Sequence, residues 1–78
     1  MNNQRELYQI AQEIFQDWKK PYFGAIPYLT AMGCLRTPQD NYGEDSAKSI
    51  VNYFLANASG WRGETAKRIK AELKQMVK

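Results

Sequence analysis

The side chains that most often carry out covalent or acid–base chemistry are scarce in this sequence. Histidine is absent, and Cys34 is the only cysteine. A cysteine or serine nucleophile needs a neighbouring base or another activating group. Cys34 lies in an apolar stretch that offers no such group, and a free cysteine in such a place commonly behaves as a small hydrophobic residue. We therefore predict a protein that is not an enzyme.

The acidic segment at residues 40–45, with the sequence DNYGED, is the candidate for a metal loop. An EF-hand loop needs oxygen ligands at alternate positions, a glycine at its sixth position and a glutamate at its twelfth. Counting from Asp40, the twelfth residue is Val51. A turn followed by a helix cap explains the composition without an ion. We expect neither a metal nor another cofactor.

Positive charge is concentrated near the C-terminal end of the chain. Residues 1–60 carry five basic and six acidic side chains, whereas residues 61–78 carry six basic and two acidic ones. On a helix, Glu64, Arg68 and Glu72 would neutralise one another at four-residue intervals, while the lysines would form a separate row. The predicted face for a nucleic acid or an acidic partner comprises Arg62, Lys67, Arg68, Lys70 and Lys74. The alternative is a solvated face that binds nothing.

Segment 52–70 also matches a helix-turn-helix pattern. With Gly60 at the turn, Ala56 takes the small-residue position of that motif, and apolar residues fall where the motif needs them. This register requires Ser59 to be buried, and it would point Arg62 and Lys67 at DNA. DNA binding through this helix pair is therefore the alternative function that the sequence predicts.

Four aromatic residues gather around Pro21, and they could form a surface for a protein partner or for self-association. They are Trp18, Tyr22, Phe23 and Tyr28. A small domain cannot bury so many rings completely, and an exposed apolar patch often marks an interface. The alternative is that the rings are half-buried with their hydroxyl groups reaching solvent. A non-catalytic interaction or accessory protein is the main functional hypothesis.

Apolar residues recur at helical spacing and predict the elements that position these side chains. Helices are expected at about 4–19, capped by Asn3, at 26–35, at 46–58, capped by Asp45 or Ser46, and at 62–77. Residues 36–44 are expected to form a loop. The predicted fold class is all-α, a compact bundle of about four short helices in one domain.

The N-terminal residues lack the basic start and apolar run of a signal peptide. No apolar stretch approaches the roughly 20 residues that span a bilayer. We therefore expect a cytoplasmic protein without membrane insertion.

Two segments carry a resemblance to other proteins. Residues 18–29 read WKKPYFGAIPYL and residues 49–58 read SIVNYFLANA. Both resemble segments of short uncharacterised proteins encoded in bacterial and phage genomes. The similarity covers most of the chain between Trp18 and Lys70. It implies a bacterial or bacteriophage origin but no activity, and it carries over no site residues.

Overall fold

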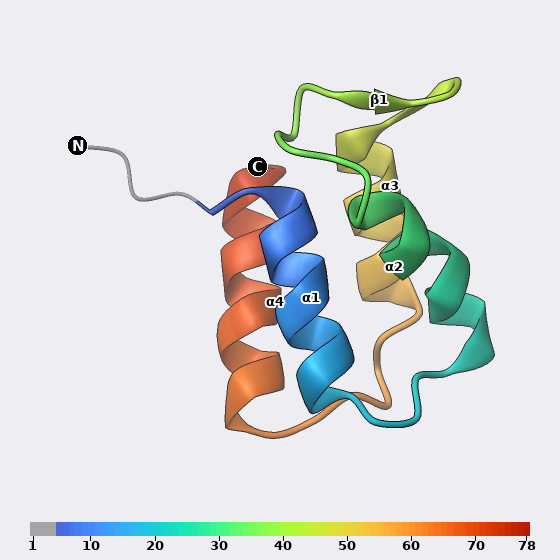
Figure 1. The fold of residues 1–78 in the computed structure, drawn as a ribbon. Coiled ribbons are helices and arrows are strands. Elements are labelled where there is room, and N and C mark those ends of the chain that lie inside the picture. Colours follow the sequence, from blue (N-terminus) through green and yellow to red (C-terminus); the bar gives the residue numbers. More distant parts are fainter. Residues whose placement is uncertain (1–4) are drawn as a thin grey trace.

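The computed structural model describes residues 5–78, and these residues are mostly helical (Figure 1). In chain order the elements are α1 (Leu7–Asp17), a 3-10 turn η1 (Phe23–Ala25), α2 (Ile26–Met32), β1 (Asn41–Tyr42), β2 (Asp45–Ser46), α3 (Ala47–Ala56) and α4 (Glu64–Met76). The four predicted helices are present. The predicted all-α class is right only in part, because two short strands pair between α2 and α3.

The first and last helices begin later than predicted, for local reasons. At the start of α1, the side-chain Oε1 of Gln9 accepts a hydrogen bond from the backbone N–H of Glu6 at 2.9 Å, so the cap lies at Glu6. The predicted cap at Asn3 lies outside the described residues. At the start of α4, Gly63 has a φ of 112°. Residues with a side chain rarely adopt this conformation, so the helix starts only after Gly63.

Helix α2 ends at Met32 instead of residue 35, because the following residues pair with α1. The backbone N–H groups of Leu7 and Tyr8 donate to the carbonyl oxygens of Arg36 and Leu35, each at 2.9 Å. The first N–H groups of a helix have no partner within it, and residues 35 and 36 supply partners for two of them. These bonds join the segment after α2 to the start of α1.

The predicted loop at residues 36–44 contains the first strand of a small hairpin. Residues of β1 and β2 pair antiparallel, with Asn41 opposite Ser46 and Tyr42 opposite Asp45. Helix α3 follows directly, and the hydroxyl of Ser46 accepts a hydrogen bond from the backbone N–H of Ser49 at 3.1 Å. Ser46 is thus the cap of α3, one of the two predicted candidates.

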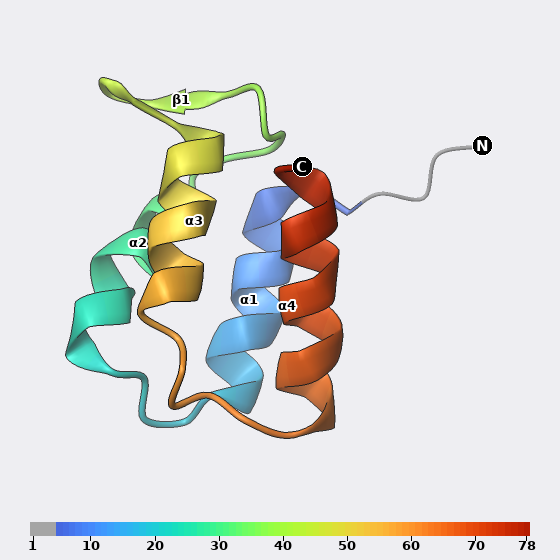
Figure 2. The same cartoon turned by 180° about the vertical axis from the view of Figure 1, so that it is seen from behind.

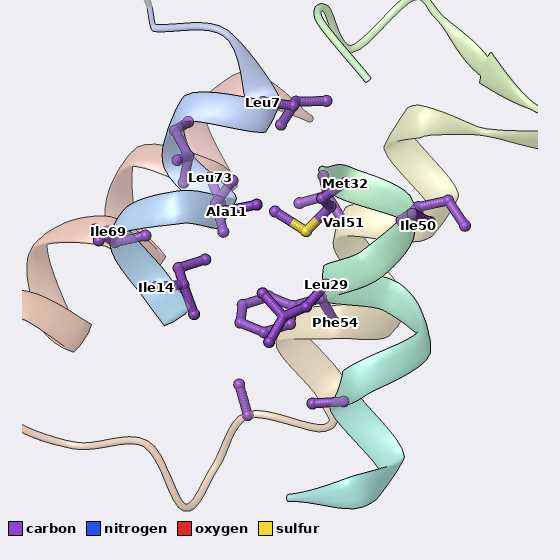
Figure 3. Packing of buried hydrophobic residues seen from close by; sticks show 14 of the residues in the cluster. Leu7, Ala11, Ile14, Leu29, Met32, Ile50, Val51, Phe54, Ile69 and Leu73 are labelled. Atoms are coloured by element: carbon purple, nitrogen blue, oxygen red, sulfur yellow. The ribbon is translucent and has the colours of Figure 1, made fainter. Parts of the chain in front are cut away.

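The helices form two layers around the core. Helices α1 and α4 lie side by side on one side of the molecule, and α2 and α3 lie side by side on the other (Figures 1 and 2). Figure 3 shows Leu7 and Ile14 of α1 with Leu73 of α4 facing Leu29 of α2 and Phe54 of α3. All five side chains are fully buried. Burial of such residues stabilises each helix by about 1.5 to 3 kcal/mol per side chain.

The hairpin lies at one end of this bundle. The connections before α2 and before α4 lie at the opposite end (Figure 1). None of the helices within residues 5–78 is long and apolar enough to cross a membrane.

Candidate interaction surface

The five cations predicted to share a face have three different environments. Arg68 pairs with Glu13 of α1 instead of the acidic residues of its own helix. Lys70 donates hydrogen bonds to two backbone carbonyls. Arg62, Lys67 and Lys74 are exposed, and no acidic side chain within residues 5–78 pairs with them. The cations available for a partner are therefore fewer than predicted.

Glu72 is also used between helices. The guanidinium of Arg5 lies 2.7 Å from the Glu72 carboxylate and 2.6 Å from that of Glu13. Arg5 and Arg68 hold the pKa of Glu13 below its ordinary value through their hydrogen bonds to its carboxylate. The expected self-neutralising series on α4 is therefore wrong, because these side chains join α4 to α1.

Lys70 braces the connection between α3 and α4. Its Nζ atom lies 2.7 Å from the carbonyl oxygen of Ala58 and 2.7 Å from that of Trp61, and it stands 5.9 Å from the centre of the Trp61 ring. Burial lowers the pKa of Lys70, and the positive charges of Lys74 and Arg62 lower it further. Lys70 therefore has a structural role that the sequence did not reveal.

Trp18 belongs to the core and not to the surface, so its predicted place in an exposed patch is wrong. Its ring stacks on Trp61 with 5.8 Å between ring centres and 12° between planes, and meets the edge of Phe54 at 6.4 Å. The indole Nε1 of Trp61 donates to Asp17 at 2.8 Å. These contacts fasten the end of α1 to the segment between α3 and α4.

Exposed apolar residues occur in the segment just after this junction and on α3, and we call this set the apolar patch. Phe23 is 76% exposed, and its ring centre lies 4.9 Å from that of Tyr22. Tyr28 is half-buried, and its ring packs at 5.5 Å from that of Tyr53. The apolar patch comprises Tyr22, Phe23, Ile26 and Tyr53, each at least 40% exposed. Tyr22 and Phe23 were predicted for this role. Ile26 and Tyr53 were missed, although Tyr53 falls outside the apolar stripe of its helix.

A groove lies beside the apolar patch, and we call it the end groove. It has a volume of about 430 Å³ and is lined by Tyr22, Ala56, Asn57, Ser59 and Gly60. The Tyr22 ring packs closely over Gly24, where a Cβ atom would come within 2.5 Å of the ring. Asn57 lies next to Gly24 and donates a side-chain hydrogen bond to the carbonyl of Tyr53 at 2.9 Å. Tyr22 of the apolar patch is thus part of the groove wall, and Asn57 of that wall is bonded to the backbone of Tyr53.

The burial of this region matches the helix-turn-helix register only in part. Trp61, Ala66 and Ile69 are buried as the register requires. Ser59, which the register needs inside, is exposed. Residues 57–63 separate α3 from α4, whereas the motif has a turn of about 3 to 4 residues. The nucleic-acid hypothesis consequently depends on the exposed cations alone.

Cys34 is exposed just after α2, so its predicted burial in an apolar helix end is wrong. Within residues 5–78, no three cysteine, aspartate or glutamate side chains gather where they could hold a metal ion. The acidic segment instead serves the loop, since the carboxylate of Asp40 accepts hydrogen bonds from the backbone N–H groups of Arg36 and Thr37. These two donors lower the pKa of Asp40.

Comparison with known proteins adds nothing to the apolar patch or the end groove. No family model, no curated protein and no solved structure matches this chain.

Proposed function

We propose that this chain is a non-catalytic interaction protein that holds a partner protein on its apolar patch. The observation that carries the proposal is the exposure of Phe23, at 76%, with its ring 4.9 Å from that of the exposed Tyr22. Single exposed apolar residues are ordinary on protein surfaces, but contiguous ones are typical of interfaces. The proposal includes an accessory role in a bacterium or bacteriophage, the origin that the resemblance of residues 18–29 and 49–58 implies.

Two rings of the patch pack against other parts of the chain. Tyr22 contacts Phe23 and Gly24, and Tyr53 lies against the half-buried Tyr28. An aromatic side chain that is already packed loses less conformational entropy on binding, so more of its burial contributes to affinity. This feature favours an interface over a surface that is apolar by chance.

The test is a selection of displayed short random peptides on the immobilised protein. We compare the wild type with a variant that carries Phe23→Ser and Tyr53→Ser. The control carries Phe15→Ser and Tyr42→Ser, which remove one phenylalanine and one tyrosine that are also exposed, at 44% and 43%, but lie outside the patch. We expect peptides to be enriched on the wild type and the control and to be lost on the patch variant, while circular dichroism shows all three folded.

Enrichment that is equal on the patch variant and the wild type would contradict the proposal, and so would the absence of enrichment on all three proteins. Either result would mean that the exposed rings do not form a binding surface.

A second candidate function is nucleic-acid binding through Arg62, Lys67 and Lys74. Their exposure without acidic partners in the described part of the chain supports this candidate. Labelled DNA should then be retained at about 50 mM salt, where phosphate contacts are strong, and Lys67→Ala with Lys74→Ala should weaken retention. No retention at that salt concentration would reject this candidate.

A further inference from the structure

Gly24 lies where the connection before α2 approaches the connection before α4. It belongs to the 3-10 turn η1 (Phe23–Ala25). A Cβ atom on Gly24 would lie 2.5 Å from Cε2 of the Tyr22 ring and 3.0 Å from Oδ1 of Asn57, the residue that caps the end of α3. Carbon atoms in van der Waals contact are about 3.5 to 4.0 Å apart. The space next to the Gly24 Cα is therefore already filled by these two side chains.

The backbone conformation of Gly24 does not require a glycine. Among the described residues, positive φ values occur at Gly43 and Gly63 and not at Gly24. A residue with a side chain can adopt the φ and ψ values of a 3-10 turn. What the missing side chain of Gly24 allows is the close packing of Tyr22 and Asn57.

The Tyr22 ring is the neighbour that a side chain on residue 24 would displace. The ring is 50% exposed, so it can move toward solvent while the backbone stays in place. Asn57 is held by the hydrogen bond that its Nδ2 donates to the carbonyl oxygen of Tyr53 at 2.9 Å. A displaced Tyr22 ring would also change its contact with Phe23, whose ring centre lies 4.9 Å away. The placement of Tyr22 in the apolar patch thus depends on Gly24.

We infer that Gly24 is a positioning residue of the apolar patch, because its lack of a side chain keeps the Tyr22 ring in the orientation that a bound partner contacts. The inference rests on the proposed function and adds a residue that acts through another. The Tyr22 ring is also part of the wall of the end groove, so the shape of that groove depends on the same position. A single methyl group on residue 24 lowers the affinity for the partner although it removes no group from the surface.

The test uses one peptide enriched on the wild-type protein and synthesised with a fluorescent label. Fluorescence anisotropy with the full chain measures its Kd for the wild type, Gly24→Ala and Gly60→Ala. We expect Gly24→Ala to weaken binding by about fivefold to tenfold, the usual effect of losing a well-placed aromatic contact. Gly60→Ala is the matched control, because it makes the same change in another residue next to the groove, where nothing lies within 4 Å of the added Cβ. It should change Kd by less than about twofold.

A double-mutant cycle separates ring positioning from general damage to the structure. Tyr22→Ser removes the ring that the added methyl group displaces. Adding Gly24→Ala to Tyr22→Ser should therefore change Kd by less than about twofold, although Gly24→Ala alone weakens binding. Nuclear Overhauser contacts between the Tyr22 and Phe23 rings provide a direct readout, and they should weaken in Gly24→Ala while circular dichroism shows unchanged helix content.

The outcomes separate this inference from the proposed function. An unchanged Kd for Gly24→Ala, with a peptide that the Phe23→Ser, Tyr53→Ser variant no longer binds, would overturn the inference and leave the proposed function standing. Equal weakening by Gly24→Ala with and without Tyr22→Ser would do the same, because the ring would then not carry the effect. Unfolding of Gly24→Ala would also overturn the inference, since residue 24 would then serve the whole fold. A peptide that binds the Phe23→Ser, Tyr53→Ser variant as tightly as the wild type would overturn both.

Discussion

Replacing Lys70 with methionine tests whether one partly buried ammonium group holds the connection between α3 and α4 in place. Methionine keeps an unbranched side chain of similar length, so the packing of the stem is largely retained. The substitution removes the two hydrogen bonds to the carbonyl oxygens of Ala58 and Trp61, each 2.7 Å long. It also removes the cation that stands 5.9 Å from the centre of the Trp61 ring.

The magnitude follows from the surroundings of the ammonium group. Hydrogen bonds to charged groups stabilise a fold by about 1.5 to 3 kcal/mol each when buried. Lys70 is only partly buried, and water can reach the freed carbonyls in the variant, so we take less than the lower end of that range for each bond, about 2 kcal/mol for the pair. In a domain of this size, a loss of about 2 kcal/mol lowers Tm by roughly 8 to 16 °C.

Thermal unfolding followed by circular dichroism measures this difference. The control is Lys74→Met, one turn further along α4, where the side chain is exposed and unpaired within residues 5–78. That variant should change stability by less than about 0.5 kcal/mol. Hydrogen exchange at the Trp61 amide, which donates to Ala58, should accelerate only in Lys70→Met. Equal Tm values for the two variants would refute the assigned role of Lys70.

Three other predictions concern the fold and its reactive groups. Gly63→Ala should lower the free energy of unfolding by about 1 to 3 kcal/mol. The cause is backbone strain alone, because φ is 112° and nothing lies within 4 Å of the added Cβ. Gly60→Ala is equally open and lacks that φ, so chemical denaturation should show almost no change. The pKa of Glu13 is held below its ordinary 4.5, chiefly by Arg5, so the stability that Glu13 contributes is complete above pH 4.5 and is lost as the pH falls through the lower pKa of the folded state. Glu13→Gln should therefore flatten the acid limb of a curve of Tm against pH. An unchanged limb would refute the role of the ion pair. Cys34 is exposed, so it should react fully with a thiol reagent in the native protein, and protection until unfolding would contradict its placement.

The helices were predictable because each one carries an apolar stripe with a 3.6-residue period. Ile10 and Ile14 of α1 and Ile50 and Phe54 of α3 are buried as their spacing predicts. Helix ends were predicted less well, since they depend on partners far away in sequence. The acceptors for the first N–H groups of α1 come from residues 35 and 36, and nothing in the local sequence reveals this pairing.

The hairpin escaped prediction because its strands are too short to carry a pattern. Each has two residues, so no alternation of buried and exposed positions distinguishes a strand from a loop. The residues between the two strands were predicted to form a loop, and they do form the turn of the hairpin. Pairing of such short segments is set by the adjacent cap of α3 and by the hydrogen bond from the Ala47 N–H to the Asp40 carbonyl at 2.8 Å.

The sequence predicted that aromatic residues form the candidate site, but it identified only some of these residues correctly. Tyr22 and Phe23 were identified because they are aromatic residues close to a proline, and they are exposed. Trp18 has the same sequence signal, but it is buried because Trp61, far away in sequence, provides a stacking partner. Whether an aromatic residue is exposed depends on such distant partners, and a single sequence does not specify them.

Arginine and lysine side chains differ in whether they form ion pairs, so net charge alone does not show which cations a partner can meet. Arg5, Arg36 and Arg68 are in ion pairs, whereas no lysine pairs with an acidic side chain within residues 5–78. A planar guanidinium can bond two carboxylates in fixed directions, as Arg5 does with Glu13 and Glu72, while a lysine gains less from such a site. Internal pairing removes three arginines and three glutamates, so the charges that remain still sum to +3. What changes is the type of cation left for a partner, because seven of the eight basic side chains that are unpaired within residues 5–78 are lysines.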